Sequence, residues 1–119
     1  MNLLDRLVSY PLGVIAVLSI AASLEAYGDS FFQTGFYWST GIRRALALVA
    51  GAAILAVYGA LVNVPRWDFG KLIGVYVGMF FLMAQIVNRV RFGHWPTPPL
   101  FAGGALIVAG GLVIAFWKG

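Results

Sequence analysis

The sequence contains no cysteine and very few charged residues. Of its 119 residues only 10% are charged, with 8 Lys or Arg against 4 Asp or Glu, and there is one histidine. The absence of cysteine excludes disulfide bonds, thiolate chemistry and cysteine-ligated metals. His94 has no partner at the spacing of a metal site, so we expect it to be a surface residue and expect no bound metal.

The scarcity of charge accompanies a large excess of apolar side chains. Hydrophobic residues make up 61% of the chain and the mean hydropathy is +0.90, whereas soluble domains carry about 25% charged residues. This composition predicts an integral membrane protein of the cell (inner or plasma) membrane, in contact with its lipids. The Lys and Arg residues lie at the ends of apolar runs, so the net charge of +4 marks span ends and does not predict nucleic-acid binding.

Four apolar segments reach the length of about 20 residues that a bilayer-spanning helix needs. We predict spans at about residues 11–36, 45–64, 72–90 and 100–117, separated by short loops in which Gly, Pro and Trp accumulate. Residues 1–119 should therefore form one all-α domain, an integral membrane bundle of four transmembrane helices with both termini on the same side.

The segment before the first span, residues 1–10, has the mixed pattern of a short interfacial helix. A second interpretation treats Arg6 and the apolar run up to residues 21–23 as a cleaved signal peptide. We disfavour it because the apolar run continues past that cluster of small residues.

The flanking charges give no clear instruction for orientation. With four spans, four basic residues fall on each side, namely Arg6, Arg66, Lys71 and Lys118 on one and Arg43, Arg44, Arg89 and Arg91 on the other. Orientation normally follows the side with more Lys and Arg. Two interpretations stay open: a partner or the insertion machinery sets one orientation, or copies insert both ways and pair antiparallel.

Glu25 is the ionisable residue that lies deepest within an apolar run. Because a charged carboxylate near the bilayer centre costs about 3 kcal/mol or more, its presence favours a functional role. Asp29 lies one turn further on the same helix face, and both desolvation and a like-charged neighbour favour the neutral form of a carboxyl group. Such a pair suits the exchange of a proton for a cationic substrate. Alternatively, a protonated Glu25 bonds a neighbouring helix, and Asp29 is a solvated or capping residue near the interface.

Other polar and aromatic residues at membrane depth are weaker candidates. Tyr76, Tyr58 and Tyr27 would line a ligand pocket through cation–π contacts or else pack in the core. We interpret Gln85 and Asn88 as interhelical hydrogen-bonding residues. The sequence has no phosphate-binding loop, nucleophile triad or haem ligands, so we expect neither an enzyme nor a cofactor.

Small residues mark two further helix faces. Gly74 and Gly78 form a GxxxG pattern, and the last span contains Gly103, Gly104, Ala109 and Gly110. Such residues let helix backbones approach closely in membranes, within the chain or between copies. A chain of four helices is also too thin to enclose much of a substrate cavity, which favours a homodimer.

The order of these features resembles the small multidrug resistance superfamily, most closely its YnfA-like branch. Residues 22–28 (ASLEAYG) are similar to its first-span A-x-x-E-x-x-G pattern, residues 74–77 to its third-span G-V-Y-V, and residues 103–110 to the G-x-x-L-I-x-A-G of its dimer-forming last span. Together the likeness extends over about residues 22–117.

This resemblance implies an antiparallel, dual-topology homodimer in which two copies of Glu25 face one chamber. Protons and small cationic or amphipathic substrates would compete for them during alternating access and export. Gln33 stands where the multidrug exporters carry lysine, and Leu72 where they carry tryptophan, which argues against broad specificity for polyaromatic drugs. Two rivals stay open: a non-transporting accessory subunit of a larger membrane complex, docked through residues 1–10, and flipping of a lipid-linked substrate.

Overall fold

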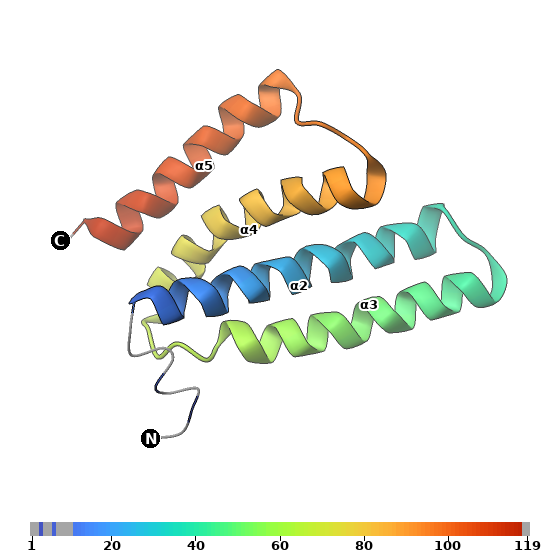
Figure 1. Ribbon diagram of the computed structural model, residues 1–119, viewed down its shortest axis with the longest axis horizontal. Coiled ribbons are helices and arrows are strands. Elements are labelled where there is room, and N and C mark those ends of the chain that lie inside the picture. Colours follow the sequence, from blue (N-terminus) through green and yellow to red (C-terminus); the bar gives the residue numbers. More distant parts are fainter. Residues whose placement is uncertain (1–2, 4–5, 7–10, 118–119) are drawn as a thin grey trace.

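The computed structural model describes Leu3, Arg6 and residues 11–117, and residues 11–117 form four helices (Figure 1). Their bounds are Pro11–Tyr37 (α2), Gly41–Val62 (α3), Phe69–Phe92 (α4) and Pro98–Phe116 (α5). Each helix is long and apolar enough to cross a membrane, and the bounds lie within about one turn of the predicted spans. The chain is therefore an all-helical, multi-pass membrane protein. The interfacial helix expected over residues 1–10 falls outside the described residues, apart from Leu3 and Arg6.

The ends of α4 follow directly from the local sequence. At its start, the carboxylate of Asp68 accepts a hydrogen bond from the backbone N–H of Lys71 at 3.1 Å. At its end, Gly93 takes the left-handed conformation with φ of 72°. The backbone N–H groups of Gly93 and His94 then donate to the carbonyls of Arg89 and Asn88, the pattern with which glycine commonly ends a helix.

The helices lie side by side in the order α3, α2, α4, α5 (Figure 1). Helix α2 packs against α3 on one side and α4 on the other, and within the described part of the chain the α5 backbone approaches only that of α4. The extents are 50 × 40 × 20 Å. The expected bundle is thus an open layer in which α3 and α5 do not meet. In lipid there is no hydrophobic force to bring two outer apolar helices together.

Glycines let α2 and α3 approach until their backbones nearly touch. A Cβ atom added to Gly51 would lie 2.9 Å from the carbonyl oxygen of Gly28, which no side chain tolerates without a backbone shift. The adjoining turn is closed by Arg44, whose Nε donates to the carbonyl of Gly35 at 2.8 Å and whose Nη2 donates to that of Phe36 at 3.2 Å. These bonds satisfy carbonyls that the end of α2 leaves unpaired.

The contact between α4 and α5 also uses glycine, and it contains three of the predicted packing residues, Gly74, Gly78 and Gly104. A Cβ atom on Gly74 would lie 2.6 Å from Ile114, and one on Gly104 would collide with Phe81. Bulkier residues at these positions would therefore force the two helices apart.

The other three predicted packing residues lie on the part of the α5 surface that α4 does not cover. A Cβ atom on Gly103 or Gly110 would meet nothing within 4 Å, and Ala109 is exposed. Within one chain this face of α5 is uncovered, so it is open to lipid or to a second copy.

Candidate functional site

Three of the four predicted site residues meet where α2, α3 and α4 converge. Glu25 lies near the middle of α2, and its Oε1 accepts a hydrogen bond from the hydroxyl of Tyr76 on α4 at 3.1 Å, across 51 residues of sequence. Tyr58 on α3 completes the group, with its ring centroid 5.8 Å from that of Tyr76, and it interacts electrostatically with Glu25. The deep carboxyl group is therefore surrounded by two phenols from two other helices.

The site lies at the edge of the buried hydrophobic cluster of the molecule. Tyr76 is 3% exposed and belongs to a buried cluster with Leu18, Ala22 and Leu72. Ala22 lies almost one turn before Glu25, and its small side chain lets α4 approach α2 closely. The Tyr76 hydroxyl is thus fixed by packing, while the Glu25 side chain stays half-buried.

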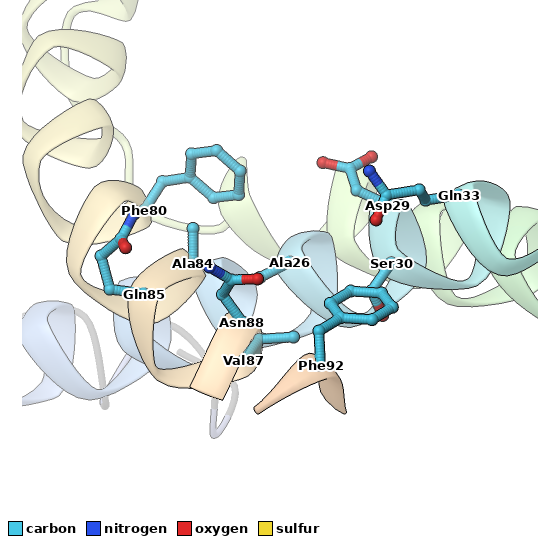
Figure 2. Close-up of a pocket in the computed structure, with 10 residues that line it drawn as sticks. All are labelled: Ala26, Asp29, Ser30, Gln33, Phe80, Ala84, Gln85, Val87, Asn88 and Phe92. Atoms are coloured by element: carbon cyan, nitrogen blue, oxygen red, sulfur yellow. The ribbon is translucent and has the colours of Figure 1, made fainter. Parts of the chain in front are cut away.

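Asp29 lies one turn beyond Glu25 on the same face of α2, and its side chain is exposed in the single chain. It is about two turns before the end of α2, so the interpretation of Asp29 as a helix cap is wrong. Its carboxylate borders an open pocket of about 270 Å³ between α2 and α4 (Figure 2).

This pocket combines polar and aromatic groups from both helices. Figure 2 shows Asp29 and Gln33 together on α2, with the amide of Asn88 extending from α4 toward α2. The Phe80 ring borders the pocket and also stacks on Tyr76, with centroids 6.2 Å apart. The pocket therefore adjoins the Glu25 site rather than forming a separate centre. Its other lining residues are Ala26, Ser30, Ala84, Gln85, Val87 and Phe92.

The interpretation of Gln85 as an interhelical hydrogen-bonding residue is wrong for its side-chain oxygen. The Gln85 Oε1 atom is buried and has no hydrogen-bond partner. Asn88, three residues on, borders the pocket beside Asp29. The polar stripe at the end of α4 thus borders cavities instead of joining two helices: Asn88 lies beside α2, and Gln85 borders both the pocket beside α2 and the space between α4 and α5.

The residue that does join α4 to α2 by hydrogen bonds here is Arg91, which sequence reasoning missed. Its Nε donates to Ser30 Oγ at 3.1 Å and its Nη2 to Thr34 Oγ1 at 2.7 Å, and the guanidinium lies 4.4 Å from the ring centroid of Phe31. A signal was available: Ser30 and Thr34 are hydroxyl residues one turn apart on an apolar helix, and so share a face.

The remaining candidates do not join the site. Tyr27 is two residues from Glu25, and side chains at that spacing do not face the same way on a helix. His94 is exposed and packs on Phe92 with centroids 6.4 Å apart, as expected of a surface residue. Among the described residues, no group of three or more His, Cys, Asp or Glu side chains could hold a metal ion.

No protein-family model, curated protein or solved structure matches the chain. The chemistry has to be argued from the site itself. A carboxyl group at membrane depth, hydrogen-bonded by a phenol and close to a polar pocket, can carry a proton in its neutral form or attract a cation in its charged form.

Proposed function

We propose that this protein is a proton-coupled exporter of small cationic or amphipathic compounds in the cell (inner or plasma) membrane. The observation that carries the proposal is the hydrogen bond from Tyr76 to Glu25 at 3.1 Å, in the middle of a membrane-spanning helix. An intramembrane carboxyl group marks a proton or substrate pathway by default. Because one carboxyl group holds either a proton or a cation, the release of one is coupled to the binding of the other.

We further propose that the working unit is an antiparallel homodimer. Asp29 and Gln33 are exposed on one face of the open layer, and a carboxylate facing hydrocarbon is expensive. A second copy packed on this face would cover both residues and supply the missing wall opposite Glu25. The equal numbers of basic residues on the two sides favour copies inserted in both orientations.

The resemblance to the small multidrug resistance superfamily, and to its YnfA-like branch, supports the same proposal. It would place two copies of Glu25 in one chamber that opens alternately to either side, with Tyr58 and Tyr76 as chamber walls. Leu72 has no aromatic ring, and it is only 2% exposed within the buried cluster. This position therefore offers no surface on which an aromatic substrate could stack. We therefore favour compact cations over large polyaromatic drugs.

The proposal is tested by exchange across liposomes. Purified protein is reconstituted with a proton gradient and a small organic cation, and proton and cation fluxes are measured together. Glu25→Gln should abolish coupled exchange, whereas Asp68→Asn should leave it intact, because Asp68 is exposed at the start of α4 and Asn caps helices equally well. Equal coupled fluxes in the wild type and Glu25→Gln would refute the assignment.

Dual topology has its own test, which the absence of cysteine makes clean. Trp95 is exposed in the loop between α4 and α5, so Trp95→Cys provides one reactive thiol. A membrane-impermeant maleimide should label about half of the copies from each side of sealed vesicles. Labelling from one side alone would contradict the antiparallel dimer.

The open layer also fits a second function, that of an accessory subunit. The uncovered faces of α3 and α5 would suit packing against larger membrane subunits. Mild extraction from the native membrane separates the two proposals. A self-contained dimer favours the exporter, and obligate co-purification with other chains, together with unchanged fluxes in Glu25→Gln, favours the accessory subunit.

A further inference from the structure

One face of α4 changes from apolar to cationic along its length. Gly78, Leu82, Gln85 and Arg89 follow one another at spacings of three or four residues, so they lie on the same face of the helix. The first three of them border the space between α4 and α5. This face is turned toward α5, which lies on the opposite side of α4 from α2 (Figure 1), and Gln85 also borders the pocket beside α2.

Two apolar cavities occupy the space between α4 and α5. The cavity farther from the α4–α5 loop measures about 250 Å³ and the one nearer to it about 350 Å³, and both are bordered by Leu82 and Val108. Because they share these two walls, they adjoin along the helices and form one groove, here called the α4–α5 groove. Their further lining residues are Ile15, Val75, Gly78, Met79, Gly111, Leu112, Ala115 and Phe116 in the first, and Phe81, Gln85, Pro96, Leu100, Phe101, Gly104 and Ala105 in the second.

A cationic side chain, that of Arg89, lies at the end of this groove nearest the loop between α4 and α5. The guanidinium of Arg89 stacks on the Trp95 ring at 4.5 Å from its centroid, and Trp95 directly precedes Pro96, which borders the groove. Stacking on a tryptophan orients the guanidinium and leaves its N–H edges free to bind an anion. Tryptophan also prefers the depth of lipid headgroups, so this cation lies where phosphate groups are found.

The stretch of the groove between Arg89 and Gly78 matches one leaflet of a bilayer in length. Arg89 lies eleven residues beyond Gly78, which is about 16 Å along a helix. Half of the hydrocarbon core is about 15 Å thick. An acyl chain whose headgroup contacts Arg89 would therefore extend along the α4–α5 groove from its loop end to the depth of Gly78.

We propose that the α4–α5 groove is a binding site for an anionic phospholipid, with its phosphate on Arg89 and one acyl chain in the groove. The groove offers an apolar surface to an acyl chain, and Arg89 at its loop end offers a positive charge to a phosphate group. Together these features favour a lipid over free phosphate. This site does not include Glu25 and shares only Gln85 with the pocket beside α2, so it goes beyond the proposed export function and stands or falls independently of it.

Native mass spectrometry of the purified wild-type protein tests the proposal, with phosphatidylglycerol, phosphatidylcholine and inorganic phosphate as probes. Phosphatidylglycerol should bind most tightly. Arg89→Gln should weaken its binding about fivefold, the usual contribution of one basic residue at an anionic surface. Arg43→Gln is the matched control, because Arg43 is also exposed and lies on the same side but outside the groove. Equal losses in the two variants would overturn the site.

A second variant pair tests the acyl chain. Val108→Phe fills the wall shared by both cavities and should weaken binding of long-chain phosphatidylglycerol severalfold, whereas Val113→Phe, at a position 51% exposed, should not. If inorganic phosphate competes as well as the lipid does, or if phosphatidylcholine binds equally, the proposal is wrong. Arg89→Gln changes a surface residue, so it remains decisive even if Val108→Phe fails to fold.

Discussion

Helices α2 and α5 are both rich in small residues, yet the protein uses them differently. In the apolar stretch of α2, 39% of the residues are buried, against 11% in that of α5. Helix α2 lies between two neighbours and is joined to α4 by side-chain hydrogen bonds from Tyr76 and Arg91. Helix α5 meets α4 at the edge of the layer through glycines and apolar side chains.

This difference teaches what small residues alone supply in a membrane. Glycine allows close approach on both helices, but a van der Waals contact has little directionality along the helix axis. Hydrogen bonds with fixed partners define which turn of α2 lies beside which turn of α4. We therefore expect α2 and α4 to move as a pair during transport and α5 to be the more freely displaced helix.

The largest expected effect is on transport, and it distinguishes the Glu25 site on α2 from the α4 face turned toward α5. Glu25→Gln on α2 should reduce coupled export at least 100-fold, because the amide neither releases a proton nor attracts a cation. Arg89→Gln, on the α4 face turned toward α5, should change export less than about twofold. Flux measurements in liposomes of one neutral lipid composition make this comparison, and a comparable loss in both variants would remove the functional distinction between the two regions.

A pair of glycine substitutions should separate the two regions in stability. In Gly51→Ala the new Cβ atom would lie 2.9 Å from the Gly28 carbonyl oxygen, whereas in Gly111→Ala the nearest atoms lie at 3.7 Å. We expect Gly51→Ala to lower the free energy of unfolding by about 1–3 kcal/mol, as overpacking does, and Gly111→Ala to be nearly neutral. Unfolding in detergent, followed by helical circular dichroism, measures both.

Gly59→Ala is the control for the added methyl group, since nothing lies within 4 Å of its Cβ position. It should match the wild type or exceed its stability slightly, because alanine favours helix. A Gly111→Ala variant as unstable as Gly51→Ala would mean that α5 is packed as rigidly as α2.

Much of the fold was predictable because bilayer thickness sets helix length. Asp68, Gly93 and Pro98 mark helix ends by local chemistry, so they are visible in sequence. The open layer was not predictable. Helices α3 and α5 are apolar on every side, so their sequences do not indicate which side packs against a neighbouring helix.

The site shows the same division between local and long-range information. Glu25 was identified by its cost in the membrane, and Tyr58 and Tyr76 by their depth. Their contact depends on α4 crossing α2 at one register, which sequence periodicity does not encode. The pairing of Arg91 with Ser30 was missed for that reason, and because an arginine near a span end has an equally good partner in lipid headgroups.

Arg91 provides a test of how strongly α2 and α4 are joined. Arg91→Met removes two hydrogen bonds and a cation–π contact, each worth about 0.5–1 kcal/mol. The free energy of unfolding should fall by about 1.5–3 kcal/mol. Arg43→Met, at an exposed position, should have no comparable effect. If the two variants unfold alike, the hydrogen bonds of Arg91 do not hold α2 against α4.

The smallest effect concerns the hydrogen bond of the site itself. Tyr76→Phe keeps the ring and its packing on Phe80 but removes the donor to Glu25. Hydrogen bonds between membrane helices average about 0.6 kcal/mol, so the free energy of unfolding should fall by that amount. The KM for the cation should also change. The control is Tyr37→Phe, at the exposed end of α2, in which the KM should change less. The cation binds to ionised Glu25, and the ionised carboxylate depends more on the Tyr76 hydroxyl as a hydrogen-bond donor than the neutral carboxyl group does. The change in KM should therefore be largest at the pH where the cation binds best. An unaltered KM throughout the pH range would leave Tyr76 as a packing residue and the carboxyl group of Glu25 as the sole determinant of binding.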